Sequence, residues 1–150
     1  MERRRVENFD TRPSGLSVSI CRPSGRILVV ERERYWLPEL LRQFLGTRVV
    51  IEEADHWPTG TSAGTSEPGS TVLVVAELSA VQAELLHAAA RTGEPLRTAS
   101  ILVTTAAQAG WEWPLRELGV RAVVDEFVGG RQMARLCRRL LQTRSARLPA

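Results

Sequence analysis

The sequence predicts an α/β domain whose parallel sheet is covered on both faces by helices. Short, wholly apolar runs rich in valine, isoleucine and leucine recur along the chain, as in strands that are buried on both faces. Segments with helical spacing of apolar residues lie between most of these runs, and such alternation favours right-handed crossovers in one sheet. The runs are residues 27–30, 49–51, 72–75, 101–103 and 122–124.

Length and composition fit one cytoplasmic domain. A chain of 150 residues with 43% hydrophobic residues can bury a core of its own. No apolar run approaches the roughly 20 residues that span a bilayer, and no secretory signal is expected. Cys21 and Cys137 lie far apart and are expected to be reduced thiols. All 20 basic residues are arginine, which excludes lysine catalysis, and the net charge of +3 does not by itself argue for nucleic acid.

The first third of the chain reads as an arm, a strand, a helix and a strand. Residues 1–25 are polar and are expected to form a flexible arm, in which residues 16–21 alternate as a short extra strand would. Strands are predicted over 26–31 and 48–54. Between them lies a helix with Pro38 in its first turn and Gly46 at its end. Its apolar face consists of Leu37, Leu40, Leu41, Phe44 and Leu45.

Residues 55–70 interrupt the alternation where a helix would be expected. Glycine, serine, threonine and proline dominate this segment, so it is predicted to be a flexible or functional loop. His56 lies in it, whereas His87 lies in the following helix, and no shared metal site is expected.

The second half restores the alternation. Strands are predicted over 71–77, 100–104 and 121–124. A helix capped by Ser79 reaches about Thr92 with Val81 and Leu85 inside, a short helix spans 111–118 and ends at Gly119, and a last helix spans 130–143 before a polar tail over 144–150. The inner face of the last helix is Met133, Leu136, Cys137, Leu140 and Leu141.

Polar residues follow the strands where an open α/β sheet places its chemistry. They are Glu31 and Arg32, Ala76 with Glu77, Thr104 with Thr105, and Asp125. In this order and spacing, residues 26–143 resemble the receiver domain of two-component response regulators. The resemblance implies a flavodoxin-like, doubly wound sheet of five strands in the order 2-1-3-4-5, in three layers.

The strand-end residues depart from the receiver pattern at three positions. Receivers hold magnesium with an acidic pair, and Arg32 places a cation there. The phosphorylated aspartate is missing, since the third strand ends in Ala76-Glu77, and Asp125 stands where receivers have a lysine that pairs with the phosphoryl group. Phosphoryl transfer to a carboxylate needs the metal, and like charges 4 Å apart cost about 4 kcal/mol at an effective dielectric near 20. The resemblance therefore implies a pseudo-receiver that is not competent for aspartyl phosphorylation.

No glycine-rich phosphate loop and no nucleophile elbow follows any strand, so neither a nucleotide enzyme nor a serine hydrolase is indicated. We expect a module that has no catalytic residue, no metal and no cofactor. Two alternatives concern the acidic strand ends: residual metal-dependent phosphotransfer, or Glu77 as a permanent mimic of a phosphorylated acceptor with Arg32 as its partner. Solvated charges paired with nearby arginines are the plainer interpretation.

A protein partner is expected on the face formed by the last two helices and the strand between them. Trp111 and Trp113 lie one residue apart on a helix, so they cannot both point inward. Exposed aromatic and arginine side chains are enriched in protein interfaces. The candidate contacts are Trp111, Trp113, Phe127, Arg131, Arg135 and Arg138, and a second copy of the chain is one candidate partner. Nucleic acid bound by the arginines is the alternative, and a membrane is not expected.

Overall fold

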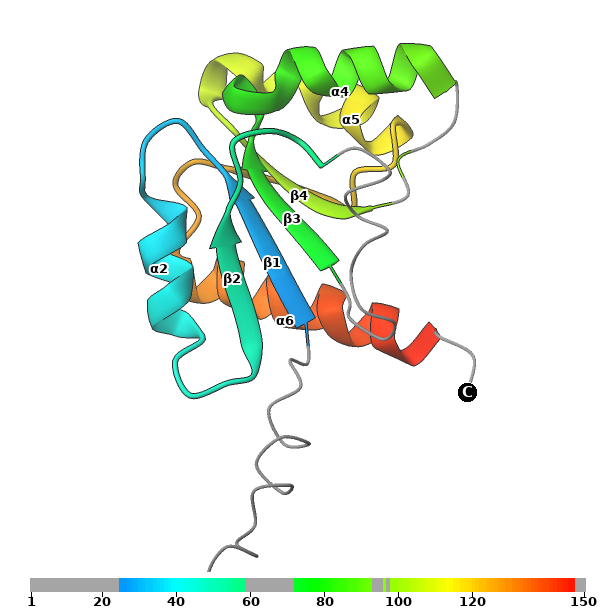
Figure 1. The fold of residues 1–150 in the computed structure, drawn as a ribbon. Helices are drawn as coiled ribbons and strands as arrows, with labels where there is room; N and C mark the ends of the chain where they lie inside the picture. The colour runs from blue at the N-terminus through cyan, green and yellow to red at the C-terminus, as the bar shows by residue number, and fades with distance from the viewer. Residues whose placement is uncertain (1–24, 59–71, 93–95, 97, 148–150) are drawn as a thin grey trace, which may run out of the picture.

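The computed structural model describes residues 25–58, 72–92, 96 and 98–147 (Figure 1). The predicted N-terminal arm, its extra strand and Cys21 lie outside the described residues. So does most of the predicted loop over 55–70, of which only residues 55–58 are described, without a helix or a strand.

Five parallel strands form one sheet in the order β2-β1-β3-β4-β5, which confirms the predicted fold class and strand order. This is the topology of flavodoxin-like folds. Two of the three inner strands, β3 and β4, are buried over four and six consecutive residues, because helices cover both faces of the sheet. The strands are β1 (Gly25–Val30), β2 (Val49–Glu53), β3 (Val72–Glu77), β4 (Ala99–Thr104) and β5 (Ala122–Asp125).

Helices form a layer on each face of the sheet (Figure 1). Helices α2 (Trp36–Gln43) and α6 (Gly130–Arg147) cover one face, where Ile27, Leu73 and Ile101 pack against them. Helices α4 (Leu78–Thr92) and α5 (Glu112–Glu117) cover the other face, where Val74 and Leu102 contribute to a second core. The alternation of strand side chains between two buried faces thus produces two hydrophobic cores.

Three predicted helix boundaries are wrong. Helix α4 begins at Leu78, directly after β3, because the Leu78 side chain is buried in the core beside the strand; Ser79 therefore lies inside the helix rather than capping it. The predicted helix over 111–118 is divided into a 3-10 helix, η2 (Ala106–Trp111), and α5, since a capping box of Thr105 and Gln108 starts helical turns earlier. Helix α6 continues to Arg147, and no glycine or proline interrupts residues 131–147.

Two glycines end helices in the left-handed region, as predicted. Gly46, with φ of +80°, follows α2 in open space, and Gly119, with φ of +103°, follows α5 in a crowded one. A Cβ at Gly119 would lie 2.8 Å from the backbone nitrogen of Leu96. Gly119 is therefore required both by its conformation and by the close approach of another segment.

Polar side chains join α2 to α6, in addition to the hydrophobic core that the two helices share. The Glu39 side chain lies against Gly130, where a Cβ would be 2.6 Å from its Cγ. At the other end of α2, Arg138 donates a hydrogen bond of 2.9 Å to the carbonyl of Gln43, and its guanidinium lies 4.7 Å from the centre of the Phe44 ring. In the described part of the chain, no helix combines the length and the hydropathy needed to cross a membrane.

Candidate site at the carboxyl edge of the sheet

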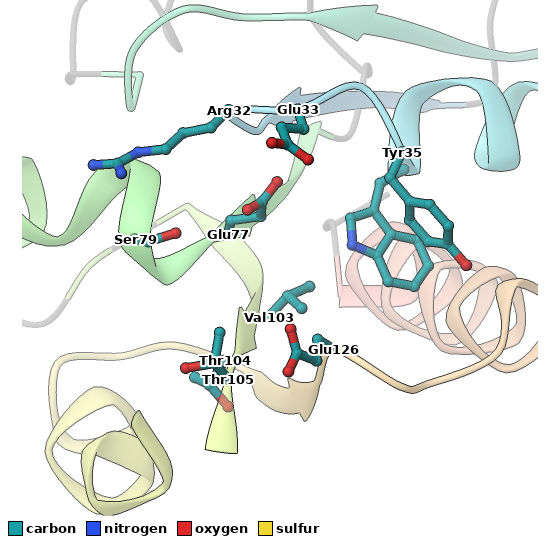
Figure 2. A pocket seen from close by; sticks show the side chains of 10 residues that line it. Arg32, Glu33, Tyr35, Glu77, Ser79, Val103, Thr104, Thr105 and Glu126 are labelled. Atoms are coloured by element: carbon teal, nitrogen blue, oxygen red, sulfur yellow. The ribbon is translucent and has the colours of Figure 1, made fainter. Parts of the chain in front are cut away.

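A cavity of about 460 Å³ opens at the carboxyl ends of β1, β3 and β4 (Figure 2). It lies beside the point where the strand order reverses between β1 and β3, the usual place of ligands in such sheets. Acidic, hydroxyl and aromatic side chains form its wall, with one arginine. The lining residues are Arg32, Glu33, Tyr35, Trp36, Glu77, Ser79, Val103, Thr104, Thr105 and Glu126.

The Glu31 side chain binds the first turn of α2. Its carboxylate accepts hydrogen bonds from the backbone N–H groups of Tyr35, Trp36 and Leu37, at 2.9, 2.8 and 2.8 Å. These N–H groups have no partner within the helix, and the helix dipole favours a negative charge beside them. The carboxylate that a receiver would offer to magnesium therefore holds this helix in place. Sequence reasoning missed this role, since the residue lies four positions before Tyr35, the N-cap residue, which itself makes no side-chain cap bond.

Glu77 is the acidic residue that β3 contributes to the cavity. The register pairs Val30 with Ala76, so Glu31 and Glu77 come next on neighbouring strands. Burial, and then the nearby carboxylate of Glu31, raise the pKa of Glu77, although a hydrogen bond from the backbone of Arg32 opposes this. Ala76 is buried under α4 instead, and it is not part of the cavity wall.

Glu33 adds a second carboxylate on the same side. Figure 2 shows the carboxylates of Glu33 and Glu77 directed toward each other, while the Arg32 side chain extends away from them. Glu33 contributes to the raised pKa of Glu77, and the charge of Arg32 lowers it only as the last of the causes. Within the described residues, no hydrogen bond or ion pair joins the side chain of Arg32 to Glu77. The arrangement gives little support to Arg32 as a counterpart of a receiver's lysine.

The two threonines after β4 are hydrogen-bonded within the fold. The buried Thr104 hydroxyl donates to the carbonyl of Val124, at 3.3 Å, and so ties β4 to β5. The Thr105 side chain accepts a hydrogen bond in the capping box of η2, and its backbone N–H donates to Gln108 Oε1 at 3.0 Å. Both residues line the cavity, but their hydroxyl groups already have structural partners.

Asp125 closes the turn between β5 and α6. Its Oδ1 accepts a hydrogen bond of 2.8 Å from the backbone N–H of Phe127. Asp125 is absent from the cavity wall, where the next residue, Glu126, supplies a carboxylate instead. A negative charge thus faces the cavity at the end of β5, one residue later than the sequence pattern indicated.

The histidines do not join these carboxylates. His56 Nδ1 lies 3.5 Å from Glu84 Oε1, and the other oxygen of Glu84 accepts a 2.7 Å hydrogen bond from the Trp57 backbone. His87 is exposed on α4. Among the residues that the structure describes, no three His, Cys, Asp or Glu side chains are placed to share a metal ion. Burial raises the pKa of the Cys137 thiol to about 12, so this thiol is a core group rather than a nucleophile.

The six candidate partner residues have different environments. Trp113 and Phe127 are 71% and 83% exposed. Trp111, in contrast, is half-buried against the core under α4 and α5. This division agrees with the expectation that only one of the two tryptophans points inward.

Arg131 and Arg135 are exposed on α6, whereas Arg138 is used in the contact with Gln43 and Phe44 described above. Sequence reasoning could not detect that role, because the hydrogen bond joins residues that are 95 positions apart.

Comparisons of the chain with protein families, with curated proteins and with solved structures find no match.

Proposed function

We propose that this chain is a non-catalytic, receiver-like module that acts through contact with another protein. The observation that carries the proposal is the hydrogen bonding of Glu31. A receiver needs free carboxylate oxygens at this position to hold magnesium, whereas here they accept three bonds from the backbone of α2. Releasing them for a metal would leave three N–H groups at the helix end without a partner.

The other cavity residues support the same proposal. A phosphoryl group would enter beside Glu33, Glu77 and Glu126, so three carboxylates would repel its negative charge. The raised pKa of Glu77 reflects burial and neighbouring carboxylates, and neither provides the positive field that an acyl phosphate needs. Residual metal-dependent phosphotransfer therefore has the weaker support.

The partner surface of the proposal is centred on Trp113 and Phe127. Trp113 lies in the first turn of α5 and Phe127 in the turn before α6, and large exposed aromatic side chains of this kind are typical anchors of protein interfaces. A single Trp→Ala change at such an anchor commonly weakens binding by about 2 kcal/mol or more, which is roughly thirtyfold.

The test compares the wild type and three variants of the tagged chain in lysate of the native host, with the retained proteins quantified by mass spectrometry. We expect a stoichiometric partner that is lost with Trp113→Ala and with Phe127→Ala. Leu86→Ala, which removes a 45% exposed apolar side chain from α4, should retain it. A partner that binds equally to all three variants would refute this surface, and binding of beryllofluoride with magnesium in a fluorine NMR titration would refute the non-catalytic assignment.

A further inference from the structure

The positive charge of the chain is concentrated in one helix. Helix α6 contains six of the 20 arginines and none of the 17 acidic residues. Because α6 contributes +6 and the whole chain carries +3, the rest of the chain has a formal charge of −3. Such a segregation of charge into one element is a feature of proteins that bind polyanions.

The core holds α6 rigidly against the sheet. Met133, Ala134, Cys137 and Leu141 are buried on the side of α6 that packs on the sheet. Helices α4 and α5 lie on the other face of the sheet (Figure 1). The helix has 18 residues and is therefore roughly 27 Å long. The outward side chains of α6 project from a helix that is already folded against the sheet. A ligand on this face would therefore not have to order the backbone of α6 on binding.

Three arginines form a row along the outer face of α6. Arg131, Arg135 and Arg139 are exposed and follow one another at four-residue intervals, which corresponds to steps of about 6 Å along the helix axis. Within the described residues, no ion pair involves any of the three. Arg138 is different, since its guanidinium is bonded to the carboxyl end of α2.

We propose that the outer face of α6 binds the phosphate backbone of nucleic acid, with Arg131, Arg135 and Arg139 as the contacts. Duplex DNA carries one negative charge per about 1.7 Å of its axis, so a straight row of guanidinium groups can neutralise several phosphates at once. This activity goes beyond the proposed protein contact and involves neither Trp113 nor Phe127.

The composition of the face favours nucleic acid over other acidic partners. Its exposed described positions are arginine, glutamine and threonine, without an apolar side chain. A helix that binds a membrane surface inserts an apolar stripe, and the apolar stripe of α6 is already in the core. A protein interface likewise needs apolar or aromatic anchors near its centre, whereas phosphate contacts are made by charged and polar side chains alone.

The test is the salt dependence of binding of the full chain to a fluorescent duplex of about 20 base pairs, measured by anisotropy between about 50 and 200 mM KCl. The slope of log K against log salt is about −0.9 for each neutralised phosphate. We expect the combined variant Arg131→Gln, Arg135→Gln and Arg139→Gln to lower the magnitude of this slope by about 2 to 3 and to weaken binding roughly tenfold or more at the lowest salt.

A control with the same loss of charge separates the face from net charge. Arg91→Gln, Arg116→Gln and Arg121→Gln remove three exposed arginines from other elements, and this combined variant should leave the slope within about 0.5 of the wild type. Equal losses in both triple variants would overturn the proposal, because binding would then follow net charge alone.

Two further arms complete the test. Arg135→Gln alone, which cannot unfold the core, should lower the slope by about 1. Trp113→Ala should retain duplex binding even if it loses the protein partner, so the two proposals can fail separately. A wild-type chain that does not bind the duplex at the lowest salt, or that binds phosphatidylserine vesicles or polyglutamate through these arginines instead, overturns the assignment to nucleic acid.

Discussion

Replacing Glu31 by alanine tests the cap on α2, and we expect a substantial loss of stability. Removing an N-cap acceptor costs about 0.5–2 kcal/mol when one hydrogen bond is lost, and the charge at the helix end adds about 0.3–1 kcal/mol. Here three backbone donors lose their acceptor. Two of these bonds are partly shielded from solvent, and the one to Tyr35 is exposed, so water can replace it. The expected loss is roughly 2–3 kcal/mol.

Urea unfolding followed by tryptophan fluorescence measures this loss, because Trp36 is buried in the core at the first turn of α2. With an m-value of about 2 kcal/mol per molar, the midpoint should fall by about 1 to 1.5 M without a change in m. Glu31→Gln retains an acceptor but not the charge, and about half of the loss is expected.

Glu33→Ala is the matched control, since it removes an exposed carboxylate from the same loop. Its effect should stay within about 0.5 kcal/mol. If Glu31→Ala behaved like Glu33→Ala, the carboxylate of Glu31 would not be holding α2, and the reason for excluding it from metal binding would be lost.

Three further substitutions test other parts of the structure. Because the folded-state pKa of Glu77 is raised, its ionisation opposes folding above its ordinary pKa. Glu77→Gln should therefore raise the free energy of unfolding near neutral pH by roughly 0.5 kcal/mol or less after allowance for solvent, and the accompanying rise in Tm should vanish at about pH 4. Ser100→Ala removes a fully buried hydroxyl that has no hydrogen-bond partner among the described residues, and it should raise the free energy of unfolding by about 1 kcal/mol, whereas a loss would reveal a partner for that hydroxyl. Gly119→Ala should cost about 3 kcal/mol or more in urea unfolding, against about 1 kcal/mol for Gly46→Ala, and equal costs would contradict the close approach of Leu96.

The strands could be predicted closely because burial on both faces leaves little choice of residue. The runs at 27–30 and 72–75 lie inside β1 and β3, and the strand order expected from the resemblance is the one observed. The helix after β3 was predicted with the wrong start, because Ser79 has the preferred chemistry of a cap, whereas burial of Leu78 draws the helix back to the end of the strand.

The candidate site was less predictable, because its chemistry depends on which way each side chain turns. The sequence placed Glu31, Thr105 and Asp125 at one edge of the sheet, and the structure agrees. Their hydrogen bonds go to the backbone of α2, to η2 and to the turn before α6, and nothing in a strand-end pattern distinguishes these partners from a ligand. These polar side chains at the strand ends therefore form hydrogen bonds with residues a few positions away and stabilise the fold, although their pattern in the sequence resembles that of a binding site.

Incubation of the full chain with acetyl phosphate and magnesium, followed by intact-mass measurement, tests the central claim most directly. The carboxylate of Glu31 is bound to α2, and three acidic side chains face the cavity, so the mass is predicted to stay unchanged. A gain of one phosphoryl group that maps to Glu77 would contradict the claim.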